Sequence, residues 1–307
     1  MTVLLITRVP VLAQDNLDRD RPSINGDTTS LGHLGILRPL SVTALVLTSY
    51  FAGLAYIGTS GYYPDDSRVP FYFTNDWKYY LQMDKFHHAF MSYNISYFGY
   101  RYFINAGIKK SKALLFGGGL GFLMLTPKEF VDGHLKDSGF SWGDITANFV
   151  GSLVMTGQEL LFDEQIVRYK FSFWRSEYAQ LGNGLLGRNF IHSYIKDYNG
   201  HTYWLSINAN RFVLKNKLPD WLNIAAGYSV NGMYGPIENR QSYNGKIIPE
   251  TLRYRQFLLS LDIDWPEIQT RSKFLKKVLN TIVFIKLPFP ALEFNSKGQF
   301  KGYWLYF

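Results

Sequence analysis

The chain contains 307 residues and no cysteine, which excludes disulfide bonds, thiolate metal sites and a cysteine nucleophile. Hydrophobic residues make up 47% of it and aromatic residues 17%, and an aromatic share this high favours a membrane interface. The net charge of +8 comes from the second half: residues 1–165 contain 13 Lys and Arg against 15 Asp and Glu, whereas residues 166–307 contain 19 against 9. Such a basic surface predicts an anionic partner. Because no nucleic-acid-binding motif is present, we expect a membrane or anionic lipid surface and no nucleic acid.

Residues 1–33 have the character of a leader followed by a tether. The stretch MTVLLITRVPVLAQ contains Val11-Leu12-Ala13, a small-residue pattern that signal peptidase accepts. This predicts an exported protein, in the periplasm or associated with the outer membrane, although a disordered leader is the alternative. Residues 14–33 are polar and rich in turn formers, which predicts a flexible tether.

Residues 34–165 are predicted to form a helical domain, a bundle of about four apolar helices at 40–58, 81–106, 113–125 and 141–163. The first of these carries no charge and is long enough to cross a membrane, but a buried core helix has the same composition. The third contains Gly117, Gly118, Gly119 and Gly121. These glycines favour close packing of another backbone, because the run lacks the Lys and the preceding strand of a phosphate-binding loop.

Residues 166–307 are predicted to form a basic, β-rich, antiparallel domain, which makes the fold class α+β. Apolar and polar residues alternate in three segments, at 203–210, 222–231 and 259–265. A period of two predicts strands with one face buried or facing lipid. Ser296-Lys297-Gly298 predicts a hairpin turn, and residues 272–286 fit a basic amphipathic helix or a further strand. An outer-membrane barrel is disfavoured, because about five predicted strands are fewer than the roughly eight that the smallest barrels need.

Three predicted helices carry acidic or amide groups at helical spacing. Asp84 and His88 are separated by four residues, Glu129 and Asp132 by three, and Asp144 and Asn148 by four, so each pair shares one helix face. Because an unpaired buried charge costs several kcal/mol, we expect these faces to meet, with Lys85, Lys128 and Asn148 as binding partners.

Two interpretations of this cluster stay open. A hydrogen-bonded structural network is slightly favoured. The alternative is catalysis, with His88 as the base, Asp84 as its orienting group and Glu129 or Asp132 as the acid; Asp144 completes the candidate catalytic set. The same groups could bind a metal ion, but the motifs of zinc proteases and serine hydrolases are absent, and we predict no metal and no cofactor.

The order Asp-Lys-x-x-His at 84–88, Lys-Glu-x-x-Asp at 128–132 and Ser-Trp-x-Asp followed by Asn-x-x-Gly at 141–151 resembles the YfiM-like envelope proteins. Those are predicted periplasmic lipoproteins without an established activity. The long members from Bacteroidota are most similar, since the likeness continues through KDYNGHTYWLSIN, KLPDWLNIAAGY, RYRQFLLSLDID and FIKLPFPALEFNSKG, over about residues 70–307. A more distant likeness to VanZ-like membrane proteins rests on Asp84, His88, Glu129, Asp144 and Asn148. The resemblance implies an envelope location and no particular reaction. The chain departs from it in having no lipobox cysteine.

The sequence therefore predicts an uncharacterised, membrane-associated envelope protein, a non-catalytic structural or accessory component. Its basic half would bind anionic lipid through Arg271, Lys273, Lys276 and Lys277, and other envelope proteins are further candidate partners. The alternative is a hydrolase that acts on a lipid or cell-wall substrate through the Asp/His/Glu cluster.

Overall fold

The protein is known from a computed structural model, which describes residues 68–208, 210 and 219–307 and a few single positions between 41 and 52. The predicted leader and tether lie outside the described residues, and so does most of the predicted helix at 40–58.

Three long helices pack side by side in the described part of the chain. They are α2 (Met83–Asn105), α4 (Leu120–Asp132) and α5 (Trp142–Phe162). α4 continues from α3 (Lys110–Ala113) through a π-helical turn, η3 (Leu114–Gly118), so the helix predicted at 113–125 begins earlier and ends later. Because the other predicted helix lies outside the described residues, the bundle of four helices stays a prediction.

The three helices touch backbone to backbone at glycines. A Cβ atom at Gly121 of α4 would lie 2.0 Å from the carbonyl oxygen of Ser92 in α2, and one at Gly151 of α5 would lie 2.2 Å from the carbonyl oxygen of Ala89. Only a hydrogen atom fits in such a contact. The close packing predicted from the glycine run at 117–121 is therefore confirmed.

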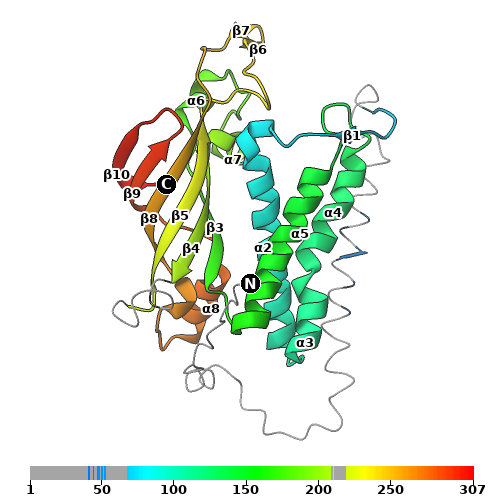
Figure 1. Ribbon diagram of the computed structural model, residues 1–307, viewed down its shortest axis with the longest axis vertical. Helices are drawn as coiled ribbons and strands as arrows, with labels where there is room; N and C mark the ends of the chain where they lie inside the picture. The colour runs from blue at the N-terminus through cyan, green and yellow to red at the C-terminus, as the bar shows by residue number, and fades with distance from the viewer. Residues whose placement is uncertain are drawn as a thin grey trace, which may run out of the picture.

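Short elements hold the upper ends of these helices in place (Figure 1). β1 (Phe73–Thr74) pairs in parallel with β2 (Phe140–Ser141), which leads directly into α5. After β1, the chain runs through Asp76 and η2 (Tyr79–Gln82) into α2. The β1–β2 pairing therefore ties the loop before α2 to the start of α5.

A six-stranded antiparallel sheet forms most of the second half, as the alternating segments predict. Its strand order is β10-β9-β8-β5-β4-β3. In chain order the strands are β3 (Val167–Phe173), β4 (His201–Asn208), β5 (Leu222–Asn231), β8 (Tyr254–Ile263), β9 (Phe289–Asn295) and β10 (Phe300–Tyr306). Gly298, with φ +76°, lies in the tight turn between β9 and β10, which confirms the predicted hairpin.

The connections between strands gather at the two ends of the sheet (Figure 1). The upper end holds α6 (Glu177–Leu181), α7 (Phe190–Lys196) and the small sheet of β6 (Ser242–Tyr243) and β7 (Lys246–Ile247), and η4 (Tyr198–Gly200) leads from α7 into β4. At the lower end, η6 (Trp265–Glu267) precedes α8 (Lys273–Thr281). The segment at 272–286, which the sequence left undecided, thus contains a helix, capped by the Ser272 hydroxyl.

Helix α2 lies between the sheet and the other two helices (Figure 1). Its Phe86 ring stacks on Tyr228 with ring centroids 4.4 Å apart, and Phe90 packs against Tyr203 and Phe171 at 5.6 Å. These aromatic contacts cover the part of the sheet nearest α2. The rest of that face, over β5, β8 and β9, is exposed and apolar.

The opposite face of the sheet is polar and buried, because the sheet curls around it. Tyr306 of β10 reaches the Thr202 hydroxyl at 3.4 Å and the Trp204 ring at 5.9 Å, although β4 is four places away in the strand order. Inside the curl, Lys170 forms an ion pair with Asp262 at 2.7 Å, and both side chains are fully buried. The sheet thus encloses charges and leaves apolar side chains outside.

Within the described residues, one helical stretch, Lys110–Asp132, has the length and apolar composition needed to cross a membrane. The core helix of a soluble protein meets the same two criteria, so this stretch by itself assigns no membrane span.

Candidate functional site

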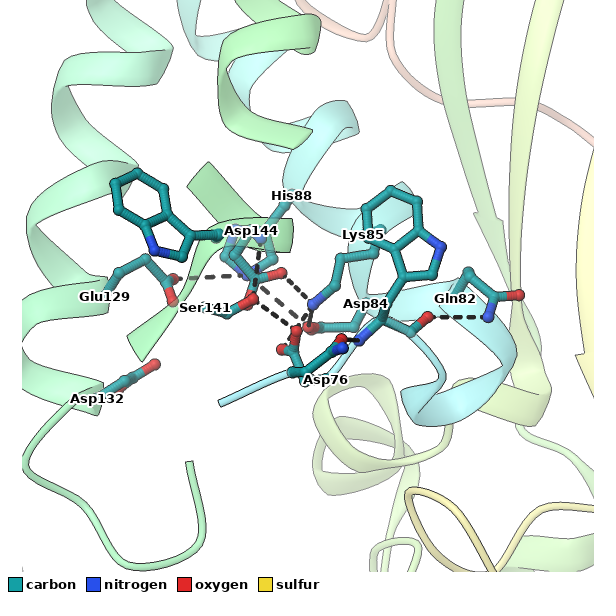
Figure 2. A network of polar contacts seen from close by, with 12 residues as sticks. Asp76, Gln82, Asp84, Lys85, His88, Glu129, Asp132, Ser141 and Asp144 are labelled. Carbon is teal, nitrogen blue, oxygen red and sulfur yellow. Dashed lines mark hydrogen bonds and ion pairs between the residues drawn. The ribbon is translucent and has the colours of Figure 1, made fainter. Parts of the chain in front are cut away.

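The predicted polar cluster lies where the ends of three helices meet. Asp84, Lys85 and His88 lie in the first turns of α2, Glu129 in the last turn of α4 and Asp144 in the first turn of α5. Because α4 ends at the level where α2 and α5 begin, these side chains converge (Figure 2). The structure therefore brings Asp84, His88, Glu129 and Asp144 together, as the helical spacing within each motif predicts.

Lys85 is the centre of the ionic contacts. Its Nζ atom lies 2.5 Å from Asp144 Oδ1, 2.6 Å from Asp76 Oδ2 and 3.1 Å from Asp84 Oδ2. The surrounding negative charges outweigh the effect of burial and raise the pKa of Lys85 above its usual value, so the ammonium stays charged. The lysine thus joins three carboxylates that come from α2, α5 and the loop after β1 (Figure 2).

Asp76 and Ser141 belong to this network, although the sequence did not predict them as site residues. Ser141 caps α5 by accepting a hydrogen bond from the Asp144 backbone N–H at 3.1 Å, and its hydroxyl donates to Asp76 Oδ1 at 2.5 Å. Asp76 lies in a loop that has no periodicity, so no spacing rule connects it to the helices. Only the β1–β2 pairing brings it there.

His88 is oriented by Asn148, one helical turn after Asp144. His88 Nδ1 lies 3.0 Å from Asn148 Oδ1, and because an amide oxygen only accepts, Nδ1 carries the proton and donates. In the neutral ring, Nε2 then holds the lone pair. That atom faces Asp144 Oδ1 at 3.6 Å, Glu129 Oε1 at 3.9 Å and Asp84 Oδ1 at 4.0 Å, distances too long for hydrogen bonds.

The acid–base properties of the cluster follow from burial and crowded negative charge. Burial lowers the pKa of His88, so the neutral ring is favoured. Burial raises the pKa of Glu129 to about 7, with the charges of Asp132 and Asp84 adding to the effect. The pKa of Asp144 is also raised, by burial and by the charge of Asp84. Burial alone would raise the pKa of Asp84 as well, but His88 and Lys85 outweigh it and hold that pKa well below its usual range.

Glu129 has the least satisfied side chain of these acids. It is 1% exposed, and its Oε1 atom has no hydrogen-bond partner among the described residues. A buried carboxylate oxygen without a donor is costly, so its position needs an explanation.

Two tyrosines connect the second half of the chain to the start of α2, Tyr198 from η4 and Tyr203 from β4. The Tyr198 hydroxyl donates to Asp84 Oδ1 at 3.2 Å, and the Tyr203 hydroxyl lies 2.8 Å from His87 Nδ1. His87 therefore points toward the sheet, and His88 points into the cluster.

The other predicted residues lie outside this network. Asp132 pairs with Lys128, whose side chain is 49% exposed, and Figure 2 shows Asp132 set apart from the contacts around Lys85. The expectation that Asp132 joins the cluster is therefore wrong at the level of direct contact. Arg271, Lys273, Lys276 and Lys277 lie on or beside α8, at the opposite end of the molecule (Figure 1).

Comparison with known proteins gives one match. Residues 72–157 match the model of a family described as predicted periplasmic lipoprotein (DUF2279). The matched segment contains α2, α4, most of α5 and every residue of the cluster around Lys85. It supports an envelope protein of unknown function and confirms the predicted location: an exported protein, in the periplasm or associated with the outer membrane. No curated protein and no solved structure matches the chain.

Proposed function

We propose that this protein is a non-catalytic, membrane-associated accessory component of the cell envelope, which contacts anionic lipid through its sheet and α8. The observation that carries the proposal is the reversed burial of the sheet. Leu259, Leu292 and Phe294 are 52%, 46% and 53% exposed, whereas Lys170, Asp262 and Glu293 on the other face are fully buried. A sheet that faces water on one side has the opposite arrangement.

The exposed apolar face is continuous across β5, β8, β9 and β10. A hollow of about 560 Å³ is lined mainly by apolar residues of these strands: Ile224, Leu259, Leu261, Pro290, Ala291, Leu292 and Trp304. Apolar patches of this kind mark contact with a membrane or another protein. The neighbouring charge favours the membrane.

That charge lies on and beside α8. This helix places exposed Phe274 and Leu275 beside Lys273, Lys277 and the preceding Arg271, which are also exposed. A short helix with apolar and basic residues lies at a lipid surface with its apolar side chains inserted and its cations at the headgroups. The sheet face and α8 together therefore suit an anionic membrane.

The helical cluster suits a structural role in this proposal. Lys85 ties together α2, α5 and the loop after β1, and Asn148 and His88 tie α5 to α2. A hydrolase acting on a lipid or cell-wall substrate is the second candidate. It is favoured by one observation: Glu129, whose pKa is about 7, faces the free Nε2 atom of His88, as an acid–base pair would.

Vesicle flotation tests the proposal. The purified full chain is mixed with vesicles of zwitterionic lipid alone or with anionic phosphatidylglycerol, and the bound fraction is measured. Leu259→Asn with Leu292→Asn should lower partitioning about tenfold or more on both vesicle types, since each half-exposed leucine contributes roughly 1 kcal/mol in lipid. The matched control is Ile247→Asn, an 86% exposed apolar residue in β7 at the other end of the molecule, which should bind like wild type.

A second variant separates the electrostatic contribution. Replacing Arg271, Lys273 and Lys277 by Gln should weaken binding to anionic vesicles by about 100-fold at low salt, at about 1 kcal/mol per cation, and leave zwitterionic vesicles unaffected. Wild-type protein that stays in the aqueous fraction with both lipids, or a double leucine variant that floats like wild type, would overturn the proposal.

A further inference from the structure

The Nε2 atom of His88 is surrounded by acidic oxygens from three helices, and nothing described in the structure lies between them. A neutral imidazole directs a lone pair at Asp84, Asp144 and Glu129, and a lone pair facing carboxylates is repelled by them. We propose that this point binds one divalent transition-metal ion, with His88, Asp84, Asp144 and Glu129 as its ligands. The sequence alone is compatible with a metal ion at these groups but predicts none.

The distances suit a metal centre. One ligand atom from each of Asp84, His88 and Asp144 can be chosen so that all three lie within 4.8 Å of one another. With metal–ligand bonds of about 2.1 Å, tetrahedral ligands are roughly 3.4 Å apart. The separations from His88 Nε2, 3.6 to 4.0 Å, therefore need only small side-chain movements to close on an ion.

The buried carboxylate oxygen of Glu129, unpaired among the described residues, is the observation that points to a bound ligand. Its side chain is 99% buried by area, and its Oε1 atom points at His88 Nε2 and receives no hydrogen bond from the part of the chain that the structure describes. The ionic contacts of the cluster do not use it. A cation between the two atoms would satisfy Glu129 and the histidine lone pair together.

Asn148 supports the same assignment. Metal-binding histidines nearly always donate their other ring N–H to an oxygen, which fixes the tautomer and the ring orientation. The 3.0 Å contact from His88 Nδ1 to Asn148 Oδ1 does this, and it leaves Nε2 as the coordinating atom.

The formal charge of the cluster also calls for a cation. Asp76, Asp84, Asp144 and Glu129 bring four negative charges when ionised, and Lys85 brings one positive charge. A divalent ion would offset two of the three remaining charges. Lys85 would stay beside the ligands and orient Asp84 and Asp144, as it does in the present contacts.

The donor set selects the type of ion. One imidazole nitrogen and several carboxylate oxygens, without sulfur, suit Zn²⁺ or Mn²⁺ better than the all-oxygen sites of Ca²⁺ and Mg²⁺. The assignment depends only on the cluster and is independent of the membrane proposal, because flotation measures the sheet and α8.

The test is metal binding by the purified full chain after removal of metals with a chelator. Titration calorimetry with ZnCl₂ and with MnCl₂ should give one site per chain for at least one of them, with weaker binding of Mg²⁺ and Ca²⁺. The melting temperature should rise with that metal, and Co²⁺ should give the visible absorption of a nitrogen- and oxygen-ligated ion. Glu129→Gln keeps the shape of the side chain but removes its charge. It should weaken metal binding by about 10- to 100-fold or more, because mutating a residue that only orients a metal ligand already lowers the affinity by that factor.

Asp163→Asn is the matched control, because Asp163 follows the far end of α5, is exposed and pairs with Lys110 away from the cluster. It should bind metal like wild type. A wild-type chain whose melting temperature and calorimetric signal respond to none of the four ions would overturn the proposal. So would a Glu129→Gln variant that melts cooperatively, as folded protein does, and binds the metal as tightly as Asp163→Asn.

Discussion

Lys85→Met should destabilise the protein more than any other single lysine substitution on the helices, because it strands three carboxylates at once. Lys85 is 6% exposed and donates to Asp76, Asp84 and Asp144 at 2.5 to 3.1 Å. Hydrogen bonds to charged groups are worth about 1.5–3 kcal/mol each, so three of them total roughly 5–9 kcal/mol. Removing the buried ammonium also removes its desolvation penalty of several kcal/mol. We therefore expect a net loss of about 3–5 kcal/mol, the usual cost of breaking a buried ion pair.

The assay is urea denaturation at pH 7 with EDTA present, so that no bound cation contributes, with the free energy of unfolding taken from circular dichroism and tryptophan fluorescence. Lys128→Met is the control, because Lys128 pairs with Asp132 on the surface and should lose at most about 1 kcal/mol. If Lys85→Met lost no more than Lys128→Met, the claim that Lys85 ties together α2, α5 and the loop after β1 would be wrong.

Two further predictions concern packing and the interior of the sheet. Gly121→Ala should cost about 1–3 kcal/mol in thermal or urea unfolding, because its Cβ would meet the Ser92 carbonyl oxygen at 2.0 Å. Gly119→Ala, whose Cβ has no neighbour within 4 Å, should be neutral or stabilising; equal effects of the two would contradict the close helix contact. Burial lowers the pKa of Lys286 from 10.5 to about 8. The folded state therefore binds this proton less tightly than the unfolded state does. As the pH rises from about 8 to 10.5, the unfolded state loses this advantage, and the contribution of Lys286 to stability increases. The stability of wild type relative to Lys286→Met should therefore increase by up to about 3 kcal/mol over that window, and a difference that does not change with pH would refute the shift.

Helical spacing was sufficient to predict the core of the candidate site. Residues three or four apart share a helix face, and buried charges must find partners, so Asp84, His88, Glu129 and Asp144 could be expected together before any coordinates were known. Gly117 and Gly121 likewise indicate a close helix contact, because a Cβ atom at either position would meet backbone atoms of α2.

Spacing could not decide which neighbours join the cluster. Asp76 comes from an irregular loop that only the β1–β2 pairing brings to the helices, whereas Asp132 turns away to Lys128 at the end of α4. Both outcomes depend on where α4 ends and on the path of the chain after β1, and neither is encoded in the period of a single helix.

Alternation predicted the strands but not which of their faces is buried. A period of two separates Leu259 and Leu261 of β8 from Ser260 and Asp262, and it is the same whether the apolar or the polar set faces inward. The tertiary structure decided this by curling the sheet, so that Lys170 on β3 reaches Asp262 on β8 and the charges satisfy each other inside. Leu259 and Leu261 are left outside because the ion pairs and hydrogen bonds that stabilise a polar interior form between strands that are far apart in the sequence. The residues of a single strand do not specify those partners.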